Sequence, residues 1–163
     1  MGLQLPGELI GLLGMLGYTW PEADETKLFD LGSSWMGFGG TVQGIASDAS
    51  SAAQQALSGN KGDDIEAFQK AWAEEDAPAA ILRDAGMGAM AVGGAFFVCA
   101  AIVLALKIQV IVQLIMLAIQ IAQAIAAAVP TFGASLTLIP LFKIATGILI
   151  DILIDQALNA LLG

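Results

Sequence analysis

The chain has 163 residues, of which 57% are hydrophobic, and its mean hydropathy of +0.78 is far above that of an ordinary soluble domain. It has a formal net charge of −9, no histidine and a single cysteine, which excludes imidazole chemistry and an internal disulfide. The acidic excess falls entirely before residue 86, and because acidic surfaces repel phosphate backbones we expect no nucleic acid partner.

The first segment, Leu3 to Leu16, is apolar and interrupted by glycine, which predicts a short docking helix or arm. It lacks the basic start and the small-residue cleavage site of a secretion signal, and Glu8 stands where positive charge belongs. Trp20-Pro21 then ends any helix, because the residue before proline disfavours helical backbone. We therefore expect residues 1–21 to be an amino-terminal arm, and any export to follow a leaderless, non-Sec route.

A heptad pattern follows and predicts a long helix packed against another at a shallow angle. Asp24 suits its start, because a carboxylate stabilises the positive end of a helix. The glycines between the apolar positions would weaken an isolated helix, so partners must hold it along its length. The expected inward seam, in alternate steps of three and four, is Leu28, Leu31, Trp35, Phe38, Val42, Ile45, Ala49, Ala52 and Ala56.

Ser58 to Gly62 predicts a turn, because its residues tolerate left-handed backbone. The seam continues through Ile65 in a returning helix, and Pro78 marks a break or a new helix start. We therefore expect residues 22–85 to form a long antiparallel helical hairpin. The aromatic residues expected to pack it are Trp20, Trp35, Phe38, Phe68 and Trp72.

A continuous apolar run from Gly86 to Val129 carries only one charged residue, Lys107. Each half of the run has roughly 20 residues, enough to cross the hydrocarbon layer of a bilayer as a helix. Ala85, Ala89 and Gly93 recur at every fourth position, a spacing that lets two helix backbones approach closely. The run is therefore predicted to be helical and closely packed.

Four glutamines gather on one face of the second half of this run, within roughly 80° of a helical wheel. Such a seam suits a helix inside a soluble bundle, a helix whose seam faces partner helices in lipid, or a helix that lines a wet lumen. The residues leave these three alternatives open. The seam, a candidate interface or lumen, consists of Gln109, Gln113, Gln120 and Gln123.

The last segment, Leu141 to Leu162, is apolar but carries a polar stripe at every fourth position. Two carboxylates in such a stripe can serve acid–base or metal chemistry, but nothing else in the chain completes a set, so we expect a solvated or interfacial face. The stripe consists of Lys143, Gly147, Asp151, Asp155 and Asn159. We expect no catalytic, cofactor-binding or metal-binding residue in the chain, and an apolar helical body over residues 86–163. The apolar end at Gly163 suggests that a longer protein continues beyond it.

The stretch Tyr18 to Trp35, YTWPEADETKLFDLGSSW, resembles the opening of the WXG-like amino-terminal domains of actinobacterial polymorphic toxins exported by the type VII (ESX) pathway. Gly59, followed by Ala67-Phe68 and Trp72, is similar to that family's hairpin turn and its A-F-xxx-W pattern. The apolar block with ALKI, IVQL and AQAIA, then TFGA, also resembles the family, so the likeness covers nearly the whole chain. One relative is a mycobacterial outer-membrane channel protein that carries a necrotising toxin.

The resemblance implies an all-α fold, in which a long antiparallel WXG-like hairpin precedes long apolar helices. It implies a secreted, non-enzymatic trafficking domain that directs a downstream toxin to the type VII secretion machinery. It also implies an export signal, an aromatic residue followed four positions later by an acid, here Trp72 and Asp76. A small helical WXG-family partner or a second copy would pair with the hairpin. The alternative function is a membrane pore or anchor in the cell envelope, built from the apolar helices.

Overall fold

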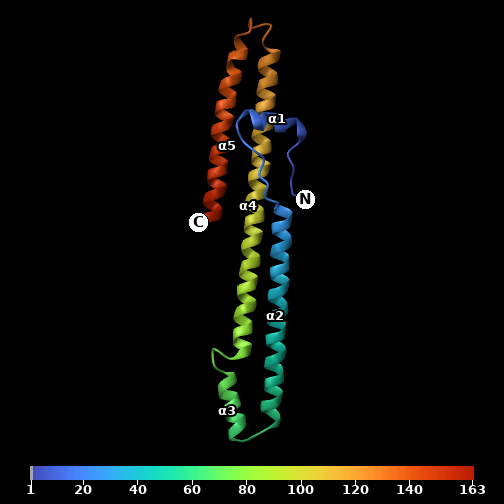
Figure 1. Cartoon of the computed structure of the whole chain (residues 1–163), viewed down its shortest axis with the longest axis vertical. Coiled ribbons are helices and arrows are strands. Elements are labelled where there is room, and N and C mark those ends of the chain that lie inside the picture. Colours follow the sequence, from blue (N-terminus) through green and yellow to red (C-terminus); the bar gives the residue numbers. More distant parts are fainter. Residues whose placement is uncertain (1) are drawn as a thin grey trace. The chain divides into compact units, whose positions relative to one another are not determined.

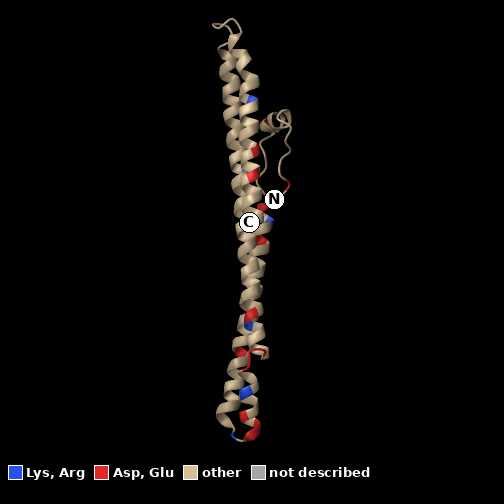
Figure 2. Ribbon diagram, turned by 90° about the vertical axis from the view of Figure 1, so that its left-hand side faces the viewer, with Lys and Arg blue, Asp and Glu red and all other residues tan. Residues whose placement is uncertain are grey.

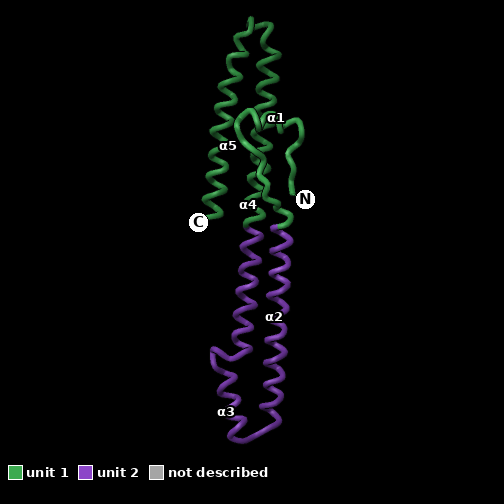
Figure 3. Tube along the Cα trace, viewed as in Figure 1, with its two compact units in different colours: residues 1–27, 99–163 green, residues 28–98 purple. Residues whose placement is uncertain are grey.

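The computed structural model describes residues 2–163, and all regular secondary structure in that range is helical. The helices in chain order (Figure 1) are α1 (Gly7–Met15), α2 (Glu25–Gly59), α3 (Asp63–Trp72), α4 (Pro78–Ala126), the 3-10 helix η1 (Ala134–Thr137) and α5 (Leu138–Leu162). The predicted all-α class with long helices is confirmed. The chain divides into two compact units (Figure 3): unit one joins the segment up to Lys27 to residues 99–163, and unit two comprises residues 28–98.

The helix ends follow local sequence rules. The Asp24 side chain accepts hydrogen bonds from the backbone N–H groups of Thr26 and Lys27, at 3.1 and 3.2 Å, and so caps α2 as expected. The predicted turn lies between α2 and α3 and includes Gly62, whose φ of 134° is rarely adopted by residues with side chains. Pro78 occupies the first position of α4, where its missing N–H has no helical partner to lose.

In unit two, α2 and the first part of α4 run antiparallel with their backbones in direct contact (Figure 1). A methyl group added at Gly39 would lie 2.7 Å from the Gly86 carbonyl oxygen. One added at Gly93 would lie 2.9 Å from the Gly32 carbonyl oxygen. Both distances are too short for a carbon atom, so Gly39 and Gly93 cannot gain a side chain unless the two backbones move apart.

The buried positions of unit two are small and repeat every seven residues on both helices. A heptad repeat keeps one face of each helix turned towards its partner, so the glycine contacts recur along the pair. On α2 the repeating residues are Gly32, Gly39, Ala46 and Ala53, and on α4 they are Ala79, Gly86 and Gly93. Ala89 is buried beside them, whereas Ala85, which was expected on the small-residue face, is exposed.

The heptad period predicted for α2 is therefore confirmed, but the predicted inward face is wrong. Of the expected seam only Val42 is buried, at 8% exposure. The large members of the seam cannot fit between two helices whose backbones touch, and they lie on the outer side of α2 instead. They are Leu31, Trp35, Phe38 and Ile45.

The return arm of the hairpin also differs from the expectation. α3 ends at Trp72, and after a turn the chain continues as α4, which supplies the glycine contacts with α2. The expected boundary between residues 85 and 86 falls inside α4, which is continuous from Pro78 to Ala126 and contributes to both units.

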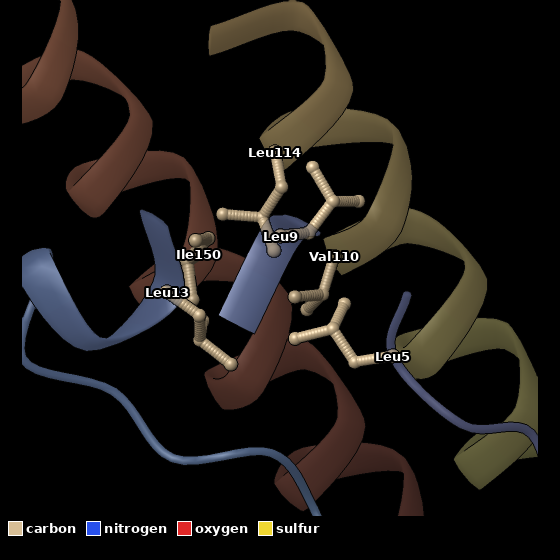
Figure 4. Close-up of a cluster of buried hydrophobic side chains, with 6 residues drawn as sticks. All are labelled: Leu5, Leu9, Leu13, Val110, Leu114 and Ile150. Atoms are coloured by element: carbon tan, nitrogen blue, oxygen red, sulfur yellow. The ribbon is translucent and has the colours of Figure 1, made fainter. Parts of the chain in front are cut away.

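Unit one is built on the second part of α4 and on α5, which run antiparallel and are joined by a turn before η1 (Figure 1). The turn contains Gly133, whose φ of 85° is a left-handed conformation that glycine adopts without strain. The arm from the amino terminus packs across both helices, as predicted for a docking helix. Its leucines meet side chains of α4 and α5 in one buried cluster (Figure 4) that comprises Leu5, Leu9, Leu13, Val110, Leu114 and Ile150.

We expect Gly39→Ala and Gly93→Ala each to lower the free energy of unfolding by about 1–3 kcal/mol, because the added methyl group forces the two backbones apart. Gly37→Ala is the matched control on the same helix, since a methyl group there meets no atom within 4 Å. It should raise stability by about 0.5–1 kcal/mol through helix propensity. Urea unfolding followed by circular dichroism measures both effects, and equal stability of Gly39→Ala and Gly37→Ala would contradict the backbone contact.

Candidate functional site

An exposed apolar ridge on α2 is the most distinctive surface of unit two. This α2 ridge consists of Leu31, Trp35, Phe38 and Ile45, which are 46%, 38%, 55% and 53% exposed. The Trp35 and Phe38 rings meet edge to face, with centroids 6.0 Å apart. A shallow groove of about 310 Å³ is lined by Leu31, Ser34, Trp35 and Phe38.

The ridge has the spacing of a helix-packing seam but has no helix against it within unit two. Apolar residues at alternating steps of three and four form the stripe that a second helix covers. In this chain the adjacent, glycine-lined face of α2 already holds α4, so the large side chains of the ridge stay at the surface. Contiguous exposed apolar surface of this kind marks an interaction site. The α2 ridge is therefore the candidate interaction surface of unit two.

The other aromatic residues expected to pack the hairpin lie in two separate places. Phe68 and Trp72 pair on α3, with ring centroids 5.5 Å apart, and Phe68 is 37% exposed. Trp20 belongs to unit one, where its indole N–H donates to the Leu3 carbonyl oxygen at 3.3 Å. The five predicted aromatic residues therefore do not form one cluster, and Trp20 packs the core of unit one.

The candidate export residues lie at the junction of α3 and α4. Trp72 is the last residue of α3 and is half-buried, whereas Asp76 is exposed in the turn that follows. Because α3 ends between them, the two side chains do not share one helical face. Figure 2 shows acidic residues gathered on α3 and on this turn.

The glutamine seam borders the buried face of α4 in unit one. Gln113 and Gln120 are half-buried, and Gln109 and Gln123 are exposed. The buried face itself is formed by Lys107, Val110, Leu114, Leu117 and Ala124. The structure therefore places the four glutamines along the edge of a packed seam.

Lys107 forms a buried ion pair that the sequence reasoning did not anticipate. Its side chain is 2% exposed, and Nζ lies 2.8 Å from Glu25 Oε2 and 2.6 Å from the Ala23 carbonyl oxygen. The Trp20 ring centroid lies 5.8 Å from the same nitrogen, within the range of a cation–π contact. A lysine alone in an apolar helix requires such partners, and that requirement was the available sequence signal.

The Glu25 carboxylate is adapted to this role. Burial raises the pKa of Glu25, but hydrogen bonds from the Leu3 backbone N–H and from Lys107 outweigh burial, so the net pKa lies below its ordinary value of 4.5. The Glu25 carboxylate is therefore ionised at neutral pH.

A second polar contact joins the arm to α5. The Tyr18 hydroxyl lies 2.6 Å from Asp151 Oδ1 and 3.0 Å from the Gly147 carbonyl oxygen. The hydrogen bond to Asp151, together with burial and the charge of that carboxylate, raises the pKa of Tyr18 to about 12. The middle of the polar stripe predicted on α5 thus faces the arm.

Comparison with known proteins gives one match. The sequence profile of the family described as WXG100 like domain matches residues 4–148, which includes most of both units. No curated protein and no solved structure matches the chain.

The outward orientation of the α2 ridge predicts different costs for two neighbouring truncations. Phe38→Ala should change the stability of the isolated chain by less than about 0.5 kcal/mol, because the ring is mostly exposed. Val42→Ala, one turn further along, should cost about 2 kcal/mol, because it removes buried methyl groups. Urea unfolding of both variants measures the difference, and a larger loss for Phe38→Ala would mean that the ridge faces inwards.

The Glu25–Lys107 pair predicts a specific pH dependence. The pKa of Glu25 is lower in the folded chain than in the unfolded one, so its stabilising contribution is complete above about pH 4.5 and is lost as the pH falls through the lowered pKa. Glu25→Gln should cost about 3–5 kcal/mol at pH 7, because it leaves a buried charge without its partner. The difference in free energy of unfolding between Glu25→Gln and wild type should narrow below about pH 4.5.

Urea unfolding between about pH 7 and pH 3 measures this gap. Glu22→Gln, which changes an exposed acid near the pair, is the control. A gap that stays constant over this range would show that Glu25 is not the titrating group.

Proposed function

We propose a trafficking role for this chain, which belongs to the WXG100-like domain family. Membership of this family makes it a helical protein associated with type VII secretion. The proposal is that the chain is a non-catalytic amino-terminal domain that directs a toxin domain, located further along a longer protein, to the secretion machinery and out of the cell by a leaderless route.

The observation that carries the proposal is the exposed α2 ridge. An export domain has to be held by other proteins during transit, and a ridge of large apolar residues at helical spacing provides the contact. Its aromatic pair, Trp35 and Phe38, supplies anchors of the kind that dominate binding energy at interfaces. The proposed partner is a small helical protein of the WXG family or a second copy of this chain.

The Trp72 and Asp76 pair is proposed as the element that the secretion machinery reads. Asp76 is exposed in the turn before α4, and Trp72 ends the preceding helix, so both lie at a surface junction of unit two. A junction between helices is accessible to a receptor without opening the glycine contact between α2 and α4.

Secretion of the full-length protein tests both parts of the proposal. Trp35→Ser combined with Phe38→Ser should reduce the secreted fraction at least ten-fold while leaving the fold intact, because neither ring is among the buried side chains of α2. Met87→Ser removes an apolar side chain of similar exposure from α4 in the same unit, and should secrete normally. Undiminished secretion of the ridge variant would refute the role of the ridge.

The same assay tests the export pair. Trp72→Ala combined with Asp76→Ala should abolish secretion, whereas Glu75→Ala, which changes the adjacent exposed acid, should not. Normal secretion of the double variant would remove the export role from those two residues and leave the role of the ridge standing.

A second candidate function is membrane association, as an anchor or as an oligomeric pore with the glutamine seam towards a lumen. Two segments, Pro78–Ala126 and Ala134–Leu162, are long and apolar enough to cross a membrane. Only 22% and 11% of their most apolar stretches are buried, so most of this apolar surface faces outwards. Val129 and Phe132, in the turn between them, are 85% and 100% exposed.

A further inference from the structure

The buried charge of the α4–α5 pair is partnered entirely by the amino-terminal arm, defined here as residues 2–25. No Asp, Glu, Lys or Arg lies between Lys107 and Lys143 in the sequence, and Figure 2 shows the corresponding ribbon without charge. Lys107 Nζ contacts the Glu25 carboxylate, the Ala23 carbonyl oxygen and the Trp20 ring. Every one of these partners comes from the last six residues of the arm.

The arm also contacts charged residues of α5. Asp151 Oδ1 accepts a hydrogen bond from the Tyr18 hydroxyl at 2.6 Å, and Lys143 Nζ lies 3.8 Å from Met15 Sδ. Three of the four charged residues that unit one has after residue 98 are therefore in contact with the arm, and the fourth is Asp155. The arm therefore lies along most of the charged residues of the helix pair.

The apolar surface of the same helix pair is left largely uncovered. The arm buries a compact cluster through Leu5, Leu9 and Leu13, but the outer sides of both helices remain exposed with the arm in place. Exposed residues on α4 include Ile108, Val112, Ile115 and Ile119, and those on α5 include Ile144, Ile148 and Ile152. The arm thus buries the Lys107 ammonium group and leaves most of the aliphatic surface of both helices exposed.

We propose that the arm is a charge clasp, in which Glu25 neutralises Lys107 so that the α4–α5 pair binds a lipid bilayer with the arm still docked. The proposal rests on the second candidate function, membrane association, and names the group that controls it. An ammonium group without a counterion strongly opposes entry into hydrocarbon, whereas a paired and hydrogen-bonded one opposes it much less. Glu25 is thereby a positioning and neutralising residue for the lipid-facing surface.

A lipid bilayer is the occupant that this surface fits best. Exposed aliphatic side chains recur along both helices, and the fully exposed Phe132 lies at the turn between them. A protein partner would be expected to meet charged groups at the rim of its contact, yet the pair carries no charged residue between Lys107 and Lys143. Lipid tails need no such groups.

Flotation with liposomes of neutral phosphatidylcholine tests the clasp, because such lipids exert no net electrostatic attraction. We expect the wild-type chain and the exposed-acid control Glu22→Gln to float with the liposomes. Glu25→Gln leaves Lys107 buried and unpaired, and should float at least ten-fold less. Glu25→Gln combined with Lys107→Met removes both charges and should recover flotation to within about two-fold of wild type.

The double variant separates neutralisation from docking. If the pair merely fixed the position of the arm, the double variant would lose flotation as the single variant does, and the clasp would be refuted. Equal flotation of Glu25→Gln and wild type would refute it as well. Should Glu25→Gln fail to fold by circular dichroism, the exchanged pair Glu25→Lys with Lys107→Glu replaces it, and failure of that folded variant to float would overturn the proposal.

The two functions fail in different ways in this experiment. Wild-type protein that remains monodisperse and apart from liposomes would refute membrane association itself, and the clasp with it. If the wild-type protein floats and the variants at Glu25 and Lys107 float equally well, only the clasp is refuted. Secretion of the full-length protein, which tests the trafficking role, is independent of both results.

Discussion

Direct contact between the backbones of α2 and α4 determines what unit two presents to its surroundings. Gly32 meets Gly93 and Gly39 meets Gly86, with no room for a single added carbon atom. Because the backbones are so close, mainly glycine and alanine occupy the inner face of α2. Its tryptophan, phenylalanine, leucine and isoleucine side chains are exposed instead. Attraction inside the hairpin then comes from many short contacts between backbone and small side chains rather than from a few large ones. The large residues remain available for binding, so the glycine contact is the structural origin of the α2 ridge.

Unit one depends on a different constraint, which is a buried charge. Lys107 lies within an apolar helix and cannot reach water, so the fold has to bring an anion and a carbonyl oxygen to it. The anion is Glu25, the first residue of α2, and the carbonyl belongs to Ala23 just before it, so the pair fixes where the arm crosses the helix pair. The leucines of α1 then complete a small core with Val110, Leu114 and Ile150. Removing either the charge pair or the leucines would leave polar or apolar groups of the same helices without partners, so the arm is an integral part of unit one.

The sequence predicts those features that depend on neighbouring residues. Asp24, Gly62 and Pro78 mark helix ends through capping, positive φ and a missing N–H, all of which act within one turn. The inward face of α2 is not predictable in the same way, because two stripes share its heptad period, one large and one small. Hydrophobicity favours the large stripe, whereas Gly86 and Gly93, far away in the sequence, select the small one. The pairing of Glu25 with Lys107 is equally long-range, and for this reason the Trp20 beside it was assigned to the hairpin instead of to unit one.

The orientation of α2 decides which of its residues unit two exposes, and thiol reactivity measures that orientation. With Cys99 replaced by alanine, single cysteines are introduced at Phe38 and at Val42, which are one helical turn apart and are 55% and 8% exposed. The account predicts that Phe38→Cys reacts with a neutral maleimide at a rate close to that of a free thiol, and that Val42→Cys reacts at least about ten-fold more slowly, because it reacts only when the hairpin opens. Protection of both thiols would show that the large seam, to which Phe38 and Val42 both belong, faces α4, and would contradict the glycine contact.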